Sequence, residues 1–246
     1  MITLQALSLH LEELMRSARF SDGCPNGVQV EGKAEIRKIV CAVSASLEAI
    51  KQAVALQADA LLVHHGLFWN REPLSICNAK RDKLKLLLSN EISLIAYHLP
   101  LDAHVELGNN WKAAKELGWQ DLEPFNEIGV KGRFNPVPVQ RFRSQIEEYY
   151  GHAAHVALGG KDLIGSAGLI SGGAHREIAH AANSNLDAYL TGSFDEPVWD
   201  IAFERKIHFF ALGHYATEKV GVAALGQHIE TSFRIPCPFI DLKNPF

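Results

Sequence analysis

Short, uninterrupted apolar runs alternate along this chain with segments that carry apolar residues at helical spacing. The runs at 38–44, 58–63 and 92–97 show little in–out alternation, which is typical of strands buried on both faces of a parallel sheet. Helical spacing at 46–57 and 109–117 provides the crossovers that parallel strands require. The pattern therefore predicts the α/β class, with mainly parallel or mixed sheets.

A stretch rich in proline and glycine interrupts this pattern between residues 123 and 138. We interpret it as the connection between two similar α/β halves, residues 1–123 and 124–246, because the strand–helix alternation resumes after it. The segment 58–64 resembles 186–192, and 94–98 resembles 209–214. Either an internal duplication or the shared composition of two ordinary βα units explains this likeness.

Composition narrows the class of partner. The net charge is −4 at pH 7 without a basic cluster, which disfavours a nucleic-acid surface. No apolar run approaches the roughly 20 residues that span a bilayer, and the N-terminus lacks the features of a secretory signal. The four cysteines are scattered, without zinc-ribbon spacing, as expected in a reducing compartment. These features predict a cytoplasmic protein with a small-molecule or protein partner and no membrane contact.

The first chemical signal is a histidine pair, His64 and His65, at the end of the run 58–63. In open α/β sheets, ligands bind beyond the carboxyl ends of the strands. Two neutral imidazoles suit zinc, iron, nickel or cobalt better than magnesium or calcium. Histidines that simply hydrogen-bond within a loop are the alternative.

The second signal follows the run 92–97, where the sequence reads His98-Leu99-Pro100-Leu101-Asp102. Asp102 adds a carboxylate that could bind or bridge metal ions. His98 could bind metal, orient a ligand or move protons, or it could be an ordinary histidine at a strand end. We favour a role beside the ligands over direct ligation.

The third signal is the pair His214 and Glu218, after the apolar run 208–212. Residues four apart lie on one face of a helix. Alternatively, His214 precedes the helix and Glu218 lies in its first turn. Taken together, five candidate ligands with two carboxylates exceed what a structural zinc needs and suit a two-metal centre.

Other catalytic motifs are weaker or missing. The chain contains neither a phosphate-binding P-loop nor a Gly-x-Ser-x-Gly nucleophile elbow. The segment Ser171-Gly172-Gly173-Ala174 could hold an anion through its amides, or it could be a plain turn between a strand and a helix.

These three signals, together with the segment Pro25-Asn26-Gly27-Val28-Gln29-Val30-Glu31-Gly32, resemble the Nif-three-like family, also called GTP cyclohydrolase 1 type 2 homologues. The resemblance covers nearly the whole chain. It implies two α/β halves with a dinuclear metal site in the cleft between them, and a toroidal homohexamer built as a trimer of dimers. It also implies two divalent ions, iron or zinc, with the ligands His64, His65, Asp102, His214 and Glu218. His98 matches a family histidine close to the site.

One residue departs from the family pattern. Family members commonly carry Thr-Gly-Glu or Thr-Gly-Asp where this chain reads Thr191-Gly192-Ser193. Asp195 and Glu196 lie near enough in sequence to substitute for the missing carboxylate. The change leaves the implied ligands intact and affects the substrate side of the site.

Two functions follow as hypotheses. The first is a metal-dependent hydrolase of a nucleotide or related ring compound, of the GTP cyclohydrolase type, in which His98 moves protons. The second is a non-enzymatic, ring-shaped metal-binding scaffold or interaction protein.

Overall fold

The computed structural model describes all residues from Met1 to Phe246, which divide into two compact units. The first unit consists of Met1–Leu101 and Gly221–Lys243, and the second of Asp102–Val220 and Asn244–Phe246. The sequence placed one boundary at 123/124. In the structure residues 102–123 group with the second unit, and Gly221–Lys243, which include most of helix α9 (His214–Phe233), group with the first.

The first unit contains a four-stranded sheet in the order β2-β6-β5-β4. Its strands are β2 (Gly27–Val30), β4 (Ile39–Ser44), β5 (Ala60–His65) and β6 (Ser93–Ala96). Strands β4, β5 and β6 are parallel, and β2 pairs antiparallel with β6. The short strands β1 (Ile2–Thr3) and β3 (Glu35–Ile36) form a separate antiparallel pair. The parallel strands therefore bring their carboxyl ends to one edge.

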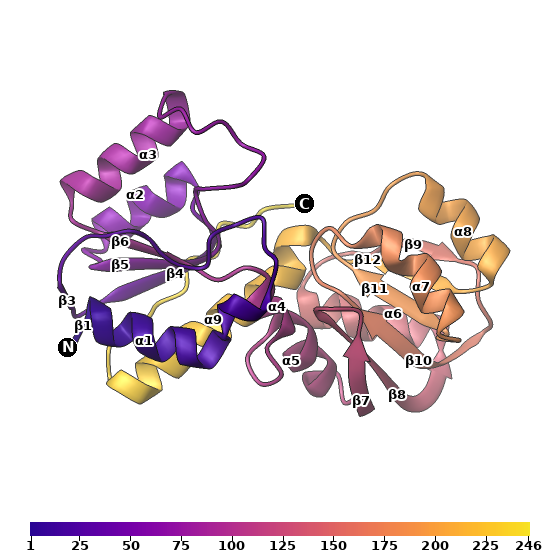
Figure 1. Cartoon of the computed structure of the whole chain (residues 1–246). Helices are drawn as coiled ribbons and strands as arrows, with labels where there is room; N and C mark the ends of the chain where they lie inside the picture. The colour runs from indigo at the N-terminus through magenta and orange to yellow at the C-terminus, as the bar shows by residue number, and fades with distance from the viewer. The chain divides into compact units, whose positions relative to one another are not determined.

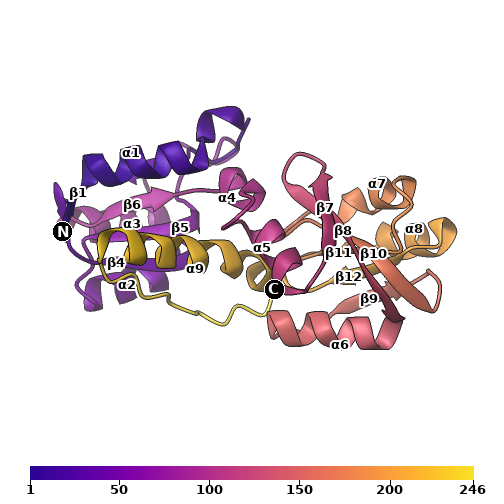
Figure 2. The ribbon, with the colours of Figure 1, turned by 90° about the horizontal axis from the view of Figure 1, so that it is seen from below.

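Helices cover both faces of this sheet (Figures 1 and 2). Helices α2 (Leu47–Ala55) and α3 (Asn78–Ser89) lie on one face, where alternate strand residues such as Val40, Leu61 and Leu94 pack against them. Helix α1 (Leu4–Met15) and the C-terminal part of α9 lie on the other face. Burial on both faces explains the uninterrupted apolar strands.

The second unit contains a six-stranded mixed sheet in the order β7-β8-β10-β11-β12-β9. Its strands are β7 (Gln120–Phe125), β8 (Gly129–Pro138), β9 (His155–Leu158), β10 (Leu163–Leu169), β11 (Ala188–Thr191) and β12 (His208–Ala211). The central strands β10, β11 and β12 are parallel, and the other pairings are antiparallel. The α/β class with mixed sheets is thus confirmed.

Two helical layers also cover this second sheet (Figure 2). Helices α5 (Asn109–Glu116) and α6 (Val139–Tyr150) pack in one apolar cluster, and α7 (Ile178–Asn183) and α8 (Pro197–Arg205) pack in another. A 3-10 turn, His175–Glu177, leads into α7. No helix of the protein combines the length and apolar character needed to cross a membrane.

Residues 123–138, interpreted from the sequence as the connection between two halves, contain regular structure that the sequence did not indicate. Most of this stretch belongs to the hairpin of β7 and β8. Proline is tolerated there because Pro124 lies on the edge strand β7, while Pro136 and Pro138 lie towards the end of β8. Asn126, with a positive φ of 53°, lies in the turn between the two strands.

The segments that resemble each other in sequence occupy corresponding places. The segments 58–64 and 186–192 contain most of β5 and β11, while 94–98 and 209–214 contain most of β6 and β12. In each unit these two strands are parallel neighbours. The likeness therefore extends from sequence to strand pairing.

Gly226 allows α9 to approach β4 closely in the first unit, since a Cβ atom there would lie 2.6 Å from the buried Cys41 Sγ. We expect Gly226→Leu to lower the free energy of unfolding by about 1–3 kcal/mol through overpacking. Gln227→Leu, on the exposed side of the same helix, should change it by less than about 0.5 kcal/mol. Urea denaturation of both variants measures the difference, and equal midpoints would contradict the close approach.

Candidate metal-binding residues and their orientation

Three histidines gather at the carboxyl edge of the first unit's sheet. His64 and His65 end β5, and His98 follows β6 on the neighbouring strand. Their ring centroids lie 4.7 Å (His64–His65), 5.0 Å (His64–His98) and 5.6 Å (His65–His98) apart. One ring nitrogen from each lies within 4.8 Å of the others. This spacing fits nitrogen donors that could share a metal ion.

Hydrogen bonds select the tautomers of two of these histidines. His64 Nδ1 lies 3.0 Å from the carbonyl oxygen of Tyr97. A carbonyl oxygen only accepts, so Nδ1 carries the proton and Nε2 carries the lone pair that a metal requires. His98 Nδ1 likewise lies 2.8 Å from Asp22 Oδ1.

Asp22 accepts several hydrogen bonds besides the one from His98. Its Oδ2 accepts from the Leu99 amide at 3.0 Å and from Asn26 Nδ2 at 3.0 Å, and its Oδ1 also accepts from the Cys24 amide at 3.1 Å. Burial alone raises the pKa of Asp22, but the hydrogen bonds from His98 and Asn26 outweigh it and hold that pKa well below its ordinary value. Asp22 is therefore ionised at neutral pH.

His65 is oriented by its neighbour across the parallel pair. Ser44 on β4 lies in register with His65 on β5, and Ser44 Oγ lies 2.9 Å from His65 Nδ1. Gly66, in the turn after His65, leaves room for the side-chain amide of Gln29, which a Cβ atom there would overlap. Gln29 Oε1 in turn accepts from the Leu67 amide at 2.8 Å.

His214 and Glu218 lie one helical turn apart in the second unit. Helix α9 begins at His214, so the same-face alternative from the sequence is the one observed. His214 Nε2 lies 3.1 Å from Glu218 Oε1, and the Glu218 side chain is 4% exposed. A carboxylate so deeply buried is costly unless charged or polar groups surround it.

Asp102 is a buried carboxylate of the second unit, carried by the short helix α4 (Leu99–Ala103). Its Oδ1 accepts from Asn109 Nδ2 at 2.8 Å and from Ser171 Oγ at 2.7 Å. Ser171 opens the glycine turn noted in the sequence, and a Cβ at Gly172 would overlap Glu218 Oε1. This turn therefore lies between two candidate ligands, Asp102 and Glu218.

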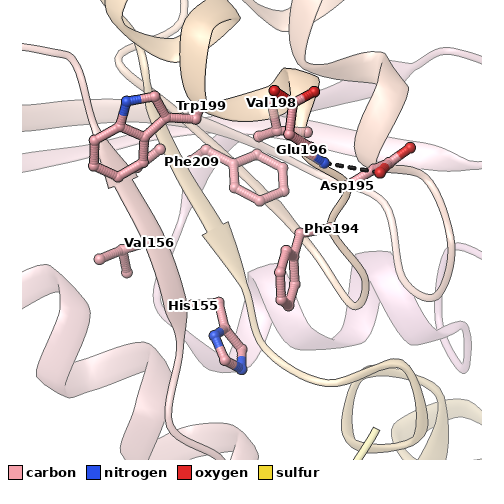
Figure 3. A pocket seen from close by; sticks show the side chains of 9 residues that line it. His155, Val156, Phe194, Asp195, Glu196, Val198, Trp199 and Phe209 are labelled. Atoms are coloured by element: carbon pink, nitrogen blue, oxygen red, sulfur yellow. Dashed lines mark hydrogen bonds between the residues drawn. The ribbon is translucent and has the colours of Figure 1, made fainter.

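Ser193, which follows Thr191-Gly192, contacts a candidate ligand. Its Oγ lies 3.1 Å from His214 Nδ1. Asp195 and Glu196 line a separate pocket together with Phe194 and Trp199 (Figure 3). In that pocket Asp195 Oδ1 accepts from the Glu196 amide at 2.8 Å. Ser193, and neither Asp195 nor Glu196, is therefore the residue seen bonded to His214.

Each unit therefore holds part of the predicted ligand set: His64 and His65 in the first, beside His98, and Asp102, His214 and Glu218 in the second. Imidazole and carboxylate donors with fixed outer hydrogen bonds fit a transition-metal or zinc ion. Sequence reasoning missed the residues that orient these side chains. Those residues are Asp22, Ser44, Asn109 and Ser171.

The contact between Asp22 and His98 gives a direct test. In metal-free wild-type protein above the titration range of histidine, we expect His98 to carry its proton on Nδ1, because the Asp22 carboxylate only accepts. Asp22→Ala should shift His98 towards a mixture of tautomers, whereas Asp82→Ala, on α3 with a side chain 46% exposed, should leave it unchanged. Nitrogen-15 NMR of the imidazoles reads this directly. An Nε2-protonated His98 in the wild type would contradict the assignment.

Comparison with known proteins places this chain among named relatives. A GTP cyclohydrolase 1 type 2 homolog from Chlamydia pneumoniae is 48% identical over 243 residues, covering 96% of this chain and 97% of the relative. A protein of the same name from Pseudomonas aeruginosa is 40% identical over 250 residues, covering 99% of each.

Solved structures of similar proteins match the whole chain. The structure of protein ybgI, of unknown function, matches with a TM-score of 0.96 at 39% identity, covering 100% of both chains. The protein TTHA1606 from Thermus thermophilus matches with a TM-score of 0.92 at 34% identity, also covering 100% of both. The model of the family Duf34/NIF3 (NGG1p interacting factor 3) matches residues 2–245. The chain belongs to the Duf34/NIF3 family.

Proposed function

We propose that this protein is a metal-dependent hydrolase that opens the ring of a nucleotide or a related heterocycle. The observation that carries the proposal is the cluster of His64, His65 and His98, with ring nitrogens within 4.8 Å at the carboxyl edge of a parallel sheet. Ligands of α/β proteins bind at such edges. The name of the relatives, GTP cyclohydrolase 1 type 2 homolog, supports a nucleotide-type ligand.

The proposed ligands of two divalent ions, iron or zinc, are His64, His65, Asp102, His214 and Glu218. The Nδ1 hydrogen bond of His64 supports this role, because it leaves the lone pair on Nε2. Hydrogen bonds from Asn109 and Ser171 fix Asp102 in one orientation. Bound ions would supply the Lewis acidity that activates water and polarises the substrate.

His98 is the proposed proton carrier. With Nδ1 donating to Asp22, its Nε2 can accept a proton from the attacking water and later return it to the leaving nitrogen. The ionised Asp22 stabilises the positive charge that forms on the ring during this transfer. Asp22 acts through His98 and is therefore a positioning residue.

Metal content tests the ligand assignment. We expect wild-type protein loaded with zinc or iron and then desalted to retain about two ions per chain. His64→Ala and Glu218→Gln should each retain fewer, because each removes a donor. His180→Ala, an exposed histidine on α7, should bind as the wild type does. Elemental analysis measures all four, and wild-type retention in both ligand variants would refute the assignment.

Turnover tests the reaction. Metal-loaded protein should release formate from GTP or hydrolyse another nucleotide, and His98→Asn should lower the rate by roughly 10²–10⁴-fold while metal content is kept. Formate detection and chromatography of the nucleotide products provide the measurement. Absence of formate from GTP, together with no hydrolysis across a set of nucleotides, would sink the proposal.

The second candidate function is a metal-binding scaffold or interaction protein without turnover. The observation that favours it is Ser193, a neutral hydroxyl bonded to His214 where the family pattern has a carboxylate. Under this alternative His65→Ala keeps protein partners, whereas an enzyme loses turnover. The homohexamer and the cytoplasmic location stay predictions.

A further inference from the structure

A cavity of about 350 Å³ lies in the first unit next to His65. It is bounded by the carboxyl ends of β4 and β5, by the start of α2 and by α3 with the loop before it. Its lining includes Ser44, Ser46, His65, Trp69, Lys80 and Lys83. We call it the Lys83 pocket.

Strand alternation explains why His65 faces this pocket. Leu61 and Val63 pack in the apolar cluster that also contains residues of α2 and α3. His65 continues the same alternate series along β5 and so extends beyond that cluster on the helix side. The pocket therefore joins a candidate metal ligand to the surfaces of α2 and α3.

Lys83 is a half-buried charged residue of this pocket. The side chain is half-buried on α3, and it forms no hydrogen bond or ion pair in the protein. Lys80, one turn earlier, donates to the Pro73 carbonyl at 3.1 Å and lies 5.0 Å from the centre of the Phe68 ring. Partial burial of an ammonium group without a hydrogen-bond partner is unfavourable, so an anion in the pocket would stabilise it.

The surrounding electrostatics are mixed. Burial lowers the pKa of Lys83, while the carboxylate of Glu72 acts in the opposite direction. Glu72 also lines the pocket but is exposed to solvent, where water screens its charge. The start of α2, capped by Ser46 Oγ at 3.0 Å from the Ala49 amide, adds the positive end of a helix dipole.

Trp69 supplies a flat aromatic wall. Its Nε1 donates to the Gly66 carbonyl at 3.2 Å, and its ring centre lies 5.9 Å from that of His65 and 5.1 Å from that of His98. The indole is therefore held beside both histidines. A planar heterocycle could stack on such a wall.

We propose that the Lys83 pocket binds the phosphate groups of a nucleotide, with Lys83 as the principal contact and the base directed towards Trp69 and His65. The inference rests on the proposed function for the choice of a nucleotide. It adds a specificity-determining residue outside the candidate ligand set. In this proposal Lys83 binds the phosphate groups of the nucleotide. The histidines of the candidate site act on the ring of its base.

Binding by metal-loaded, full-length protein tests the pocket. Isothermal titration calorimetry with GTP and with guanosine compares the wild type, Lys83→Gln and Lys85→Gln. Lys85→Gln is the control, because Lys85 is exposed on the same helix and its substitution removes the same charge. We expect Lys83→Gln to weaken GTP binding by about 10–100-fold, because a charge-assisted hydrogen bond is lost. Lys85→Gln should remain within about twofold of the wild type, as expected for an exposed charge.

Guanosine and salt complete the test. Guanosine should bind all three proteins equally, and raising the salt concentration should weaken GTP binding in the wild type more than in Lys83→Gln. Thermal melts followed by circular dichroism should show that both variants fold. Three results would each overturn the proposal. The two variants could bind GTP with equal affinity, or Lys83→Gln could lose as much affinity for guanosine as for GTP. The third is a wild type that does not bind GTP.

The outcomes also separate the pocket from the proposed function. Lys83-dependent GTP binding without release of formate or hydrolysis of other nucleotides supports the pocket and overturns the hydrolase. Formate release whose KM for GTP is unchanged in Lys83→Gln supports the hydrolase and overturns the pocket.

Discussion

The parallel pairing of β4, β5 and β6 is the constraint on which the first unit's candidate site depends. Parallel strands end at one edge, so His65 lies in register with Ser44, and Tyr97 follows the partner of Val63. The same pairing that buries the apolar strands therefore supplies the hydroxyl and the carbonyl that orient His65 and His64. The strand register sets both the position and the tautomer of a candidate ligand.

The second unit repeats this arrangement with other side chains. Ser171, Ser193 and His214 lie just beyond the ends of the parallel strands β10, β11 and β12. The two serines bond to Asp102 and His214. In both units, residues at or just beyond the carboxyl ends of parallel strands include candidate ligands and the side chains that orient them.

The partners of the histidines differ in charge, and this suggests a division of roles. Ser44 and Ser193 orient His65 and His214 through neutral hydroxyls. An ionised carboxylate, Asp22, holds His98. A carboxylate partner stabilises an imidazole that gains charge, which suits proton transfer, whereas a neutral partner suffices to aim a ligand.

The sequence by itself determined the α/β class, the order of most strands and helices, and the candidate ligands, because burial on both faces and polar residues after apolar runs are local patterns. It missed the hairpin of β7 and β8, since Pro124 and the nearby glycines read as irregular chain until an edge position explains them. Only the tertiary structure decided that Asp22 holds His98, because 76 residues separate them and no periodicity links them. The tertiary structure also decided that Lys83 is half-buried in the pocket next to His65. Burial of a side chain depends on packing between elements, which the local sequence does not show.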